Sequence, residues 1–413
     1  MSARRPRVLF VSHAGSRNGA TILLLSFLRW LRPQVDWDIE VLMNGHGPLV
    51  DEFRAVARTT IWRNPETRLA ALLPRSTTAL QQSVVSAYAG LMLPGGEFDL
   101  VYANTAAAAP IVAHLGTRAR KLLWHVHELS YALDSILTRP DWLQRFRGAT
   151  RHVAVSRAVQ DCLVDVHGID PAGIDLVHGF VEARALGAES EPVRRARIRA
   201  QLGIRDDVFL MGACGSLGWR KGSDVFLQVA HHLASTAAGQ DIAFLWVGGH
   251  HGEAGAIEFE HDMRRLGLGD RCRLVPTTAE ALDYYAAMDV FALTSREDPF
   301  PLVVLEAADC GVPVVCFDGG GGAIEFVGDD AGFTAPYLDI ACFARRVSDL
   351  RANRALASRL GERGRARVEQ SHRLERQAPL LLQAMQRCLA GESAPQTTRI
   401  STDLEPRPTP HPR

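Results

Sequence analysis

Two carboxylates, Asp298 and Glu306, stand eight positions apart in a segment that is otherwise mostly apolar. The apolar run at 289–293 just before them predicts a short buried strand. Pro301 suits the first position of a helix, and Gly311 suits the position just past its end. The segment therefore predicts a strand, a polar loop, a helix and a second strand, with the functional edge at the loop that follows the first strand.

The N-terminus of this predicted helix could hold an anionic group. The amides of Leu302 and Val303 are free there, beside the positive end of the helix dipole. Asp298 lies at this end, and Glu306, one turn beyond Leu302, could accept hydrogen bonds from ribose hydroxyls. A nucleoside diphosphate fits both features. A capping acid and a structural glutamate would explain the same residues without any ligand.

The same residues resemble the signature of a known enzyme family. Retaining glycosyltransferases of the GT-B fold, in family four (group 1), carry two acids with seven residues between them, usually as Glu-Pro-Phe-Gly and then Glu-Ala. Here Asp298 to Pro301 reads Asp-Pro-Phe-Pro, and Glu306 is followed by Ala307. The first acid is an aspartate and a proline replaces the glycine, so Glu297 is the alternative first acid. The resemblance implies an α/β protein with two Rossmann-like, doubly wound domains facing a central cleft.

A loop at 215–222 follows the apolar strand predicted at 209–213 and precedes a predicted helix. In the family this loop supplies two cations to the donor diphosphate, and paired cations offset the charge that grows on a departing diphosphate. Lys221 matches the family's Lys-Gly. The family's earlier arginine is Ser216 here, so Arg220 is expected to supply the missing charge. A solvated basic turn is the structural alternative.

The resemblance extends to the first half of the chain. The loop after the strand at 7–12 resembles the family's Gly-Gly-Ala turn, which implies that the amide of Gly19 approaches the phosphate. His125 and His127 share one face of a strand end. His127 and Glu128 resemble the family's His-Asp, which implies that His127 contacts the sugar. Metal binding and a plain histidine pair remain alternatives.

In the second half, the resemblance places the loop at 273–277 beside the nucleotide base, recognised by backbone groups, and places residues 319–322 and Glu325 near the donor sugar. The implied catalytic residues are Lys221, Arg220, Asp298 and His127, and the implied donor-binding residues are Gly19, Glu297, Glu306, Leu302, Val303 and Thr277.

Composition is that of a soluble globular protein. The 413 residues are enough for two domains, and 47% of them are hydrophobic. The formal net charge is zero, which gives no basis for nonspecific nucleic-acid binding. The seven cysteines form no C-x-x-C pair and are expected to be reduced. No signal peptide and no spanning apolar run is visible, so a cytoplasmic protein is expected, with the inner face of the membrane left open.

Strands and helices alternate along the chain, as in doubly wound sheets. Apolar periodicity is lost at 182–191, which predicts a linker. The segment 68–93 is apolar and short of acids, and it is interpreted as a buried helix pair or a membrane-surface element. The expected divisions are an acceptor-binding domain at 1–183, a nucleotide-sugar domain at 184–372, a helix returning to the first domain at 373–390, and a disordered tail at 391–413.

The implied function is retaining, metal-independent transfer of a sugar from a nucleotide-diphosphate sugar, such as a UDP- or GDP-sugar, to a glycan, lipid-linked or small-molecule acceptor. No cofactor is implied. Asp36 and Asp38 form a D-x-D triplet that is interpreted as a surface turn rather than a metal motif. Two alternatives remain: an inactive sugar-nucleotide-binding partner subunit, motivated by the departures at Ser216, Asp298 and Pro301, and a sugar-nucleotide epimerase.

Overall fold

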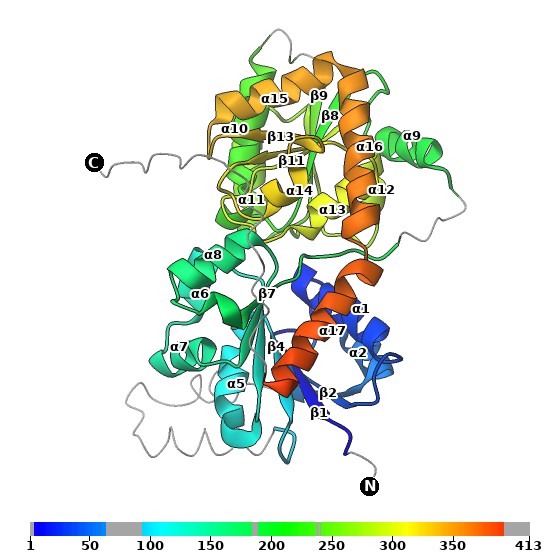
Figure 1. Ribbon diagram of the computed structural model, residues 1–413. Helices are drawn as coiled ribbons and strands as arrows, with labels where there is room; N and C mark the ends of the chain where they lie inside the picture. The colour runs from blue at the N-terminus through cyan, green and yellow to red at the C-terminus, as the bar shows by residue number, and fades with distance from the viewer. Residues whose placement is uncertain (1–3, 63–92, 184–188, 237–238, 240, 392–413) are drawn as a thin grey trace.

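The computed structural model describes residues 4–62, 93–183, 189–236, 239 and 241–391. Two parallel β-sheets, each covered by helices, form two α/β domains stacked one above the other (Figure 1). This arrangement confirms the predicted fold class of two Rossmann-like domains.

The first sheet has the strand order β3-β2-β1-β4-β5-β6-β7, and each neighbouring pair is parallel. Helices cover its faces, so β1 (Arg7–Ser12) and β4 (Leu100–Asn104) are buried along most of their length and carry near-continuous apolar runs. The other elements are β2 (Asp38–Asn44), β3 (Arg58–Trp62), β5 (Leu122–Val126), β6 (Arg151–Ala154), β7 (Ile174–Leu176), α1 (Gly19–Leu31), α2 (Val50–Val56), α5 (Ala109–Leu115), α6 (Ser130–Ile136), α7 (Pro140–Arg147) and α8 (Arg157–Asp165).

The second sheet has the order β10-β9-β8-β11-β12-β13 and is also parallel. Its order reverses between β8 and β11, and loops at such a switch point commonly bind ligands. The strands are β8 (Phe209–Cys214), β9 (Ile242–Val247), β10 (Cys272–Val275), β11 (Val290–Leu293), β12 (Val314–Phe317) and β13 (Gly332–Ala335). The helices are α9 (Glu191–Gln201), η4 (Trp219–Lys221), α10 (Ser223–Ala234), α11 (Ala254–Arg265), α12 (Ala281–Ala287), α13 (Leu302–Asp309), α14 (Ala323–Val327), α15 (Ile340–Ala352) and α16 (Arg354–Ser371).

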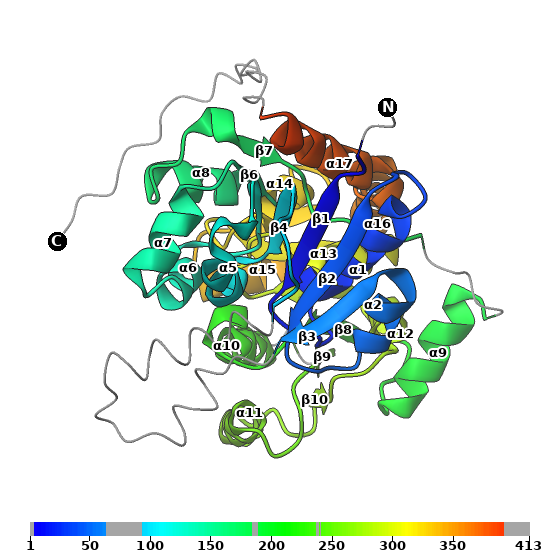
Figure 2. The same ribbon diagram turned by 90° about the horizontal axis from the view of Figure 1, so that it is seen from below.

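The last described helix, α17 (Leu374–Ala390), packs on the first domain. Its buried side chains, including Leu381 and Met385, share a core with residues of α1 and β1. Just before α17, the amide of Val181 in the first domain donates to the carbonyl of His372 at 2.9 Å, which fixes the point where the chain returns to that domain. Seen from below, α17 lies beside the first sheet (Figure 2).

The helix that follows Asp298 and contains Glu306 begins at Leu302, with Pro301 as its extended N-cap, one residue later than the sequence predicts. Most of the apolar segment 68–93, the centre of the expected linker and the tail from residue 392 lie outside the described residues. None of the described helices is both long enough and apolar enough to cross a bilayer.

Candidate functional site

The predicted cation and the predicted first acid meet at the end of the second sheet. Lys221, at the end of η4, places its Nζ 2.5 Å from Oδ2 of Asp298, in the loop between β11 and α13. Both side chains are mostly buried, and the hydroxyl of Ser295 donates to the same Oδ2 at 3.2 Å. Two loops that lie far apart in sequence therefore form one charged centre.

The backbone conformation at position 222 explains why a glycine follows this lysine. Its φ of +65° lies in the left-handed region, and a Cβ there would overlap the carbonyl oxygen of Thr294. The hydroxyl of Thr294 donates to the carbonyl of Gly222 at 2.9 Å. Because Thr294 leads into the loop that carries Asp298, this close backbone contact brings Lys221 and Asp298 together.

The two candidate first acids point in different directions. Asp298 faces Lys221, whereas Oε1 of Glu297 accepts a hydrogen bond from the amide of Tyr131 in α6 of the first domain, at 2.9 Å. The guanidinium of Arg220 donates to the carbonyl of Glu297 at 3.1 Å. Arg220 is therefore fixed next to the charged pair, and Glu297 caps a helix of the other domain.

The glycine loop predicted near the donor sugar lies against the backbone of Asp298. The amide of Asp298 donates to the carbonyl of Gly320 at 2.7 Å, and the amide of Gly322 donates to the carbonyl of Asp298 at 3.0 Å. In the same region, Glu325 accepts from the amides of Arg157 and Ala158 at the start of α8. The loop is thus tied to the acid and to the first domain.

The start of α13 faces the start of α1 across the domain boundary. The side chain of Leu302 lies 3.5 Å from where a Cβ on Gly19 would stand. Nearby, a Cβ on Gly179 would lie 2.8 Å from the ring of Phe300. Gly19 and Leu302 are therefore close together at the boundary between the domains, and Val303 follows Leu302 in the first turn of α13.

Glu306 has a partner that the sequence analysis did not identify. Its Oε2 accepts a hydrogen bond from the hydroxyl of Tyr285, in α12, at 3.0 Å. Burial raises the pKa of Glu306, and the hydrogen bond from Tyr285 acts in the opposite direction. No sequence pattern links the two residues, because Tyr285 reads as an ordinary core aromatic on its helix.

The two histidines at the end of β5 lie together, with ring centroids 4.1 Å apart. Burial, with a smaller contribution from His13, lowers the pKa of His127 to about 3. Nε2 of His127 is buried and has no hydrogen-bond partner among the described residues. Nδ1 of His125 is occupied by the hydroxyl of Tyr102 at 2.5 Å. His127 is therefore a neutral imidazole whose buried Nε2 has no hydrogen-bond partner in the part of the chain that the structure describes.

Glu128 was not predicted as a site residue, yet it is the most perturbed carboxylate near His127. Burial raises its pKa to about 7, although the amides of Ala106 and His127 donate to it at 3.1 and 2.9 Å. The charge of Arg220 acts on it as well. Its position directly after His127 in the matched motif is the only sequence signal for it.

Thr277 and the D-x-D triplet at 36–38 take no part in the contacts of the charged centre. Thr277 is exposed, and its amide and hydroxyl both donate to the carbonyl of Gly249, joining the loops after β10 and β9. Asp36 and Asp38 lie at the start of β2, the opposite strand end from the site loops, where Asp36 pairs with Arg5 at 2.9 Å. No group of three metal-ligating side chains is found in the described part of the chain.

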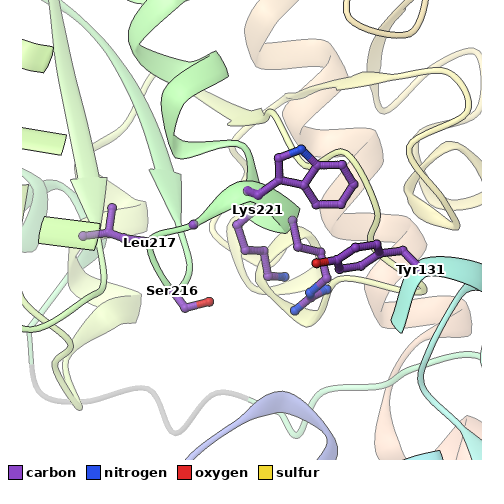
Figure 3. Close-up of a pocket in the computed structure, with 7 residues that line it drawn as sticks. Tyr131, Ser216, Leu217 and Lys221 are labelled. Atoms are coloured by element: carbon purple, nitrogen blue, oxygen red, sulfur yellow. The ribbon is translucent and has the colours of Figure 1, made fainter. Parts of the chain in front are cut away.

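A cavity of about 220 Å³ opens beside the charged centre (Figure 3). It lies between the loop after β8 and the start of α6, so both domains contribute to its wall. The lining residues are Tyr131, Ser216, Leu217, Gly218, Trp219, Arg220 and Lys221.

Two family models match the chain. Residues 17–184 match the model described as Glycosyltransferase Family 4, and residues 194–367 match the one described as Glycosyl transferases group 1. A D-inositol 3-phosphate glycosyltransferase from Streptomyces bingchenggensis is 29% identical over 70% of this chain and 66% of its own length. One from Catenulispora acidiphila is 28% identical over 56% of this chain. The chain thus spans 66% and 59% of the lengths of these two relatives.

Solved structures share the fold. HepE from Anabaena, in complex with UDP and glucose, superposes with a TM-score of 0.75 at 21% identity, covering 92% of this chain and 99% of its own. Sucrose-phosphate synthase from Thermosynechococcus elongatus gives a TM-score of 0.70 at 21% identity, covering 94% and 100% of the two chains.

Proposed function

Because this chain belongs to the family-four (group 1) glycosyltransferases of the GT-B fold, we propose that it catalyses retaining, metal-independent sugar transfer. The donor is a nucleotide-diphosphate sugar, and the acceptor is a glycan, a lipid-linked sugar or a small molecule. The observation that carries the proposal is the buried contact between Lys221 and Asp298 beside Arg220.

The charges suit a diphosphate that leaves. Negative charge grows on the donor phosphates as the bond to the sugar breaks, and fixed cations stabilise it without reorganisation. Lys221 and Arg220 provide two cations in one turn of chain. The first amides of α13, at Leu302 and Val303, lack partners within the helix and add the positive end of its dipole. The amide of Gly19 approaches the same phosphates from the first domain.

The remaining residues position the nucleoside and the sugar. Glu306 accepts hydrogen bonds from the ribose hydroxyls, and the backbone around Thr277 contacts the base. Asp298 lies beside the transferred sugar, where its carboxylate meets the charge that develops at the anomeric carbon. His127, neutral and with an Nε2 that lacks a partner among the described residues, hydrogen-bonds a sugar hydroxyl.

A UDP-sugar is the first donor to test, because the HepE structures were solved with UDP and UDP-glucose. The protein works in the cytoplasm, and for a lipid-linked acceptor at the inner face of the membrane. The inactive-partner alternative rests on Ser216, Asp298 and Pro301, where the family has arginine, glutamate and glycine. Arg220 supplies a cation in place of the family's arginine at position 216, since its guanidinium is held next to the charged pair.

The test is a panel of UDP- and GDP-sugars with the purified chain. Thermal stabilisation reports binding, since a ligand at about 100 times its Kd adds about 2.7 kcal/mol. Release of free nucleotide together with a product of unchanged anomeric configuration supports the proposal. Binding without nucleotide release supports the inactive partner, and an epimeric sugar nucleotide supports the epimerase.

A further inference from the structure

Tyr131 and Trp219 form an aromatic pair at the mouth of the cavity, one from each domain. Their ring centroids lie 4.7 Å apart with an interplanar angle of 45°. Even in contact, Tyr131 is 55% exposed and Trp219 is 52% exposed. Phe300, which packs against His178 at the domain boundary, is by contrast only 8% exposed. Packing between the domains therefore explains the burial of Phe300, but it does not explain why Tyr131 and Trp219 keep exposed ring faces.

The pair is held in place by the loop that carries Asp298. The amide of Tyr131 donates to Glu297, and the guanidinium of Arg296 lies over the Trp219 ring, 5.4 Å from its centroid. Arg296 also donates to the carbonyl of Trp219 at 2.9 Å and pairs with Asp224. Large apolar groups that are both fixed and exposed are typical of binding sites, because little conformational entropy is lost when a ligand covers them.

The pair lies on the side of the cavity away from the loops proposed for the nucleotide base. Figure 3 shows Tyr131 entering the cavity from the first domain, while Ser216 and Leu217 lie on the opposite side. Leu217 packs against Gly249, whose carbonyl binds Thr277 in the loops proposed for the base. The aromatic wall is thus the wall nearest the domain to which the acceptor is assigned.

We propose that Tyr131 and Trp219 form a stacking platform for a pyranose ring of the acceptor, so that the acceptor is a glycoside. The proposal rests on the function proposed above and specifies its acceptor class. The C–H face of a pyranose is apolar and lies flat on an aromatic ring, while its hydroxyls remain at the rim. Of the cations near this wall, Arg220 and Lys221 are assigned to the donor diphosphate and Arg296 is paired with Asp224. A phosphorylated polyol would therefore compete with the donor for its cations, whereas a pyranose ring needs none.

The experiment uses the full chain with the donor identified in the panel. Methyl hexopyranosides, linear hexose trisaccharides and myo-inositol 3-phosphate are compared as acceptors by initial rates. The wild type is expected to use the trisaccharides. Trp219→Ala and Tyr131→Ala should each raise the trisaccharide KM about tenfold, the scale of one lost stacking contact. Trp219→Phe keeps a stacking face and should stay within about threefold of wild type.

Ile257→Ala is the matched control, because Ile257 is a 58% exposed apolar side chain on α11. It should leave the trisaccharide KM unchanged. Transfer to inositol phosphate alone, or a trisaccharide KM that Trp219→Ala and Tyr131→Ala do not alter, overturns the platform. Nucleotide release without acceptor is recorded for the wild type throughout. If the wild type releases nucleotide, either of these two outcomes rejects the platform and leaves the proposed function standing. If no sugar nucleotide is ever cleaved, the proposed function fails as well.

Discussion

The ammonium group of Lys221 and the carboxylate of Asp298 lie 2.5 Å apart, and each comes from a loop that follows a parallel strand of the second sheet. Removing one partner of a buried ion pair leaves an uncompensated charge and costs about 3–5 kcal/mol of stability. Substitutions at either position therefore affect folding as well as chemistry. Tests of this site need variants that keep the shape or change both partners.

The two candidate acids should separate on conservative substitution. Asp298→Asn keeps an acceptor for Ser295 but removes the charge beside the sugar, so turnover should fall about 10²- to 10³-fold with donor binding nearly kept. Glu297→Gln keeps a carbonyl for the amide of Tyr131, so its effect should be mild. Steady-state kinetics and donor titration of the two variants make the comparison. Loss of transfer in Glu297→Gln alone would mean that Glu297 is the working acid.

Glu306→Gln should weaken donor binding by about 1.5–3 kcal/mol, the range for a hydrogen bond to a charged group. Tyr285→Phe is the control, because it removes the hydroxyl that donates to Glu306 and leaves the carboxylate. It should affect donor binding less than Glu306→Gln does. Calorimetric titration with the nucleoside diphosphate measures both variants, and equal affinities in wild type and Glu306→Gln would remove Glu306 from the ribose site.

Glu128 should make stability depend on pH. Its folded pKa of about 7 lies above the ordinary value of 4.5, so the folded state binds the proton more tightly. Stability from this group is therefore present below about pH 4.5 and is lost as the pH rises to about 7. Relative to Glu128→Gln, the wild type should lose about 1–3 kcal/mol of unfolding free energy as the pH rises from about 4.5 to about 7.

Urea unfolding of both proteins from pH 4.5 to 7.5 measures this difference. His127 titrates with the opposite sign, because its lowered pKa makes stability fall as the pH drops below about 6.5. That contribution is common to both proteins and largely cancels. Parallel stability curves for wild type and Glu128→Gln would show that Glu128 is ionised throughout.

Turnover should survive EDTA. Lys221, Arg220 and the start of α13 supply positive charge to the diphosphate, so the proposed chemistry needs no divalent ion. Initial rates before and after chelation, with Mg²⁺ or Mn²⁺ added back, measure this. Activity that disappears with EDTA and returns with either ion would contradict metal independence.

Strand positions followed from composition, because strands covered on both faces are apolar runs that end in polar loops. Lys221 and Asp298 were identified from local motifs, and Gly222 shows why: the glycine is required where the two loops touch. Only the fold shows that Lys221 binds Asp298 directly, since no local pattern reports a contact between such distant positions.

Other contacts carry no sequence signal at all. Tyr285 and Tyr131 read as ordinary helix aromatics, and only the tertiary structure brings them to Glu306 and Glu297. The raised pKa of Glu128 is a consequence of burial, which depends on packing from several elements. Residues on the motif loops can thus be predicted from the sequence, whereas the partners that hold them are visible only in the fold.

Lys221 is the residue to which we assign stabilisation of the departing diphosphate. The most direct measurement compares turnover and nucleotide-sugar Kd between Asp298→Asn and the double variant that carries both Asp298→Asn and Lys221→Ala. The double variant leaves no buried carboxylate unpaired. Removing Lys221 in this background should lower kcat about 10²- to 10³-fold and change the donor Kd by less than about tenfold, because its charge matters most as the phosphate leaves. A folded double variant with the same kcat as Asp298→Asn would contradict this role of Lys221.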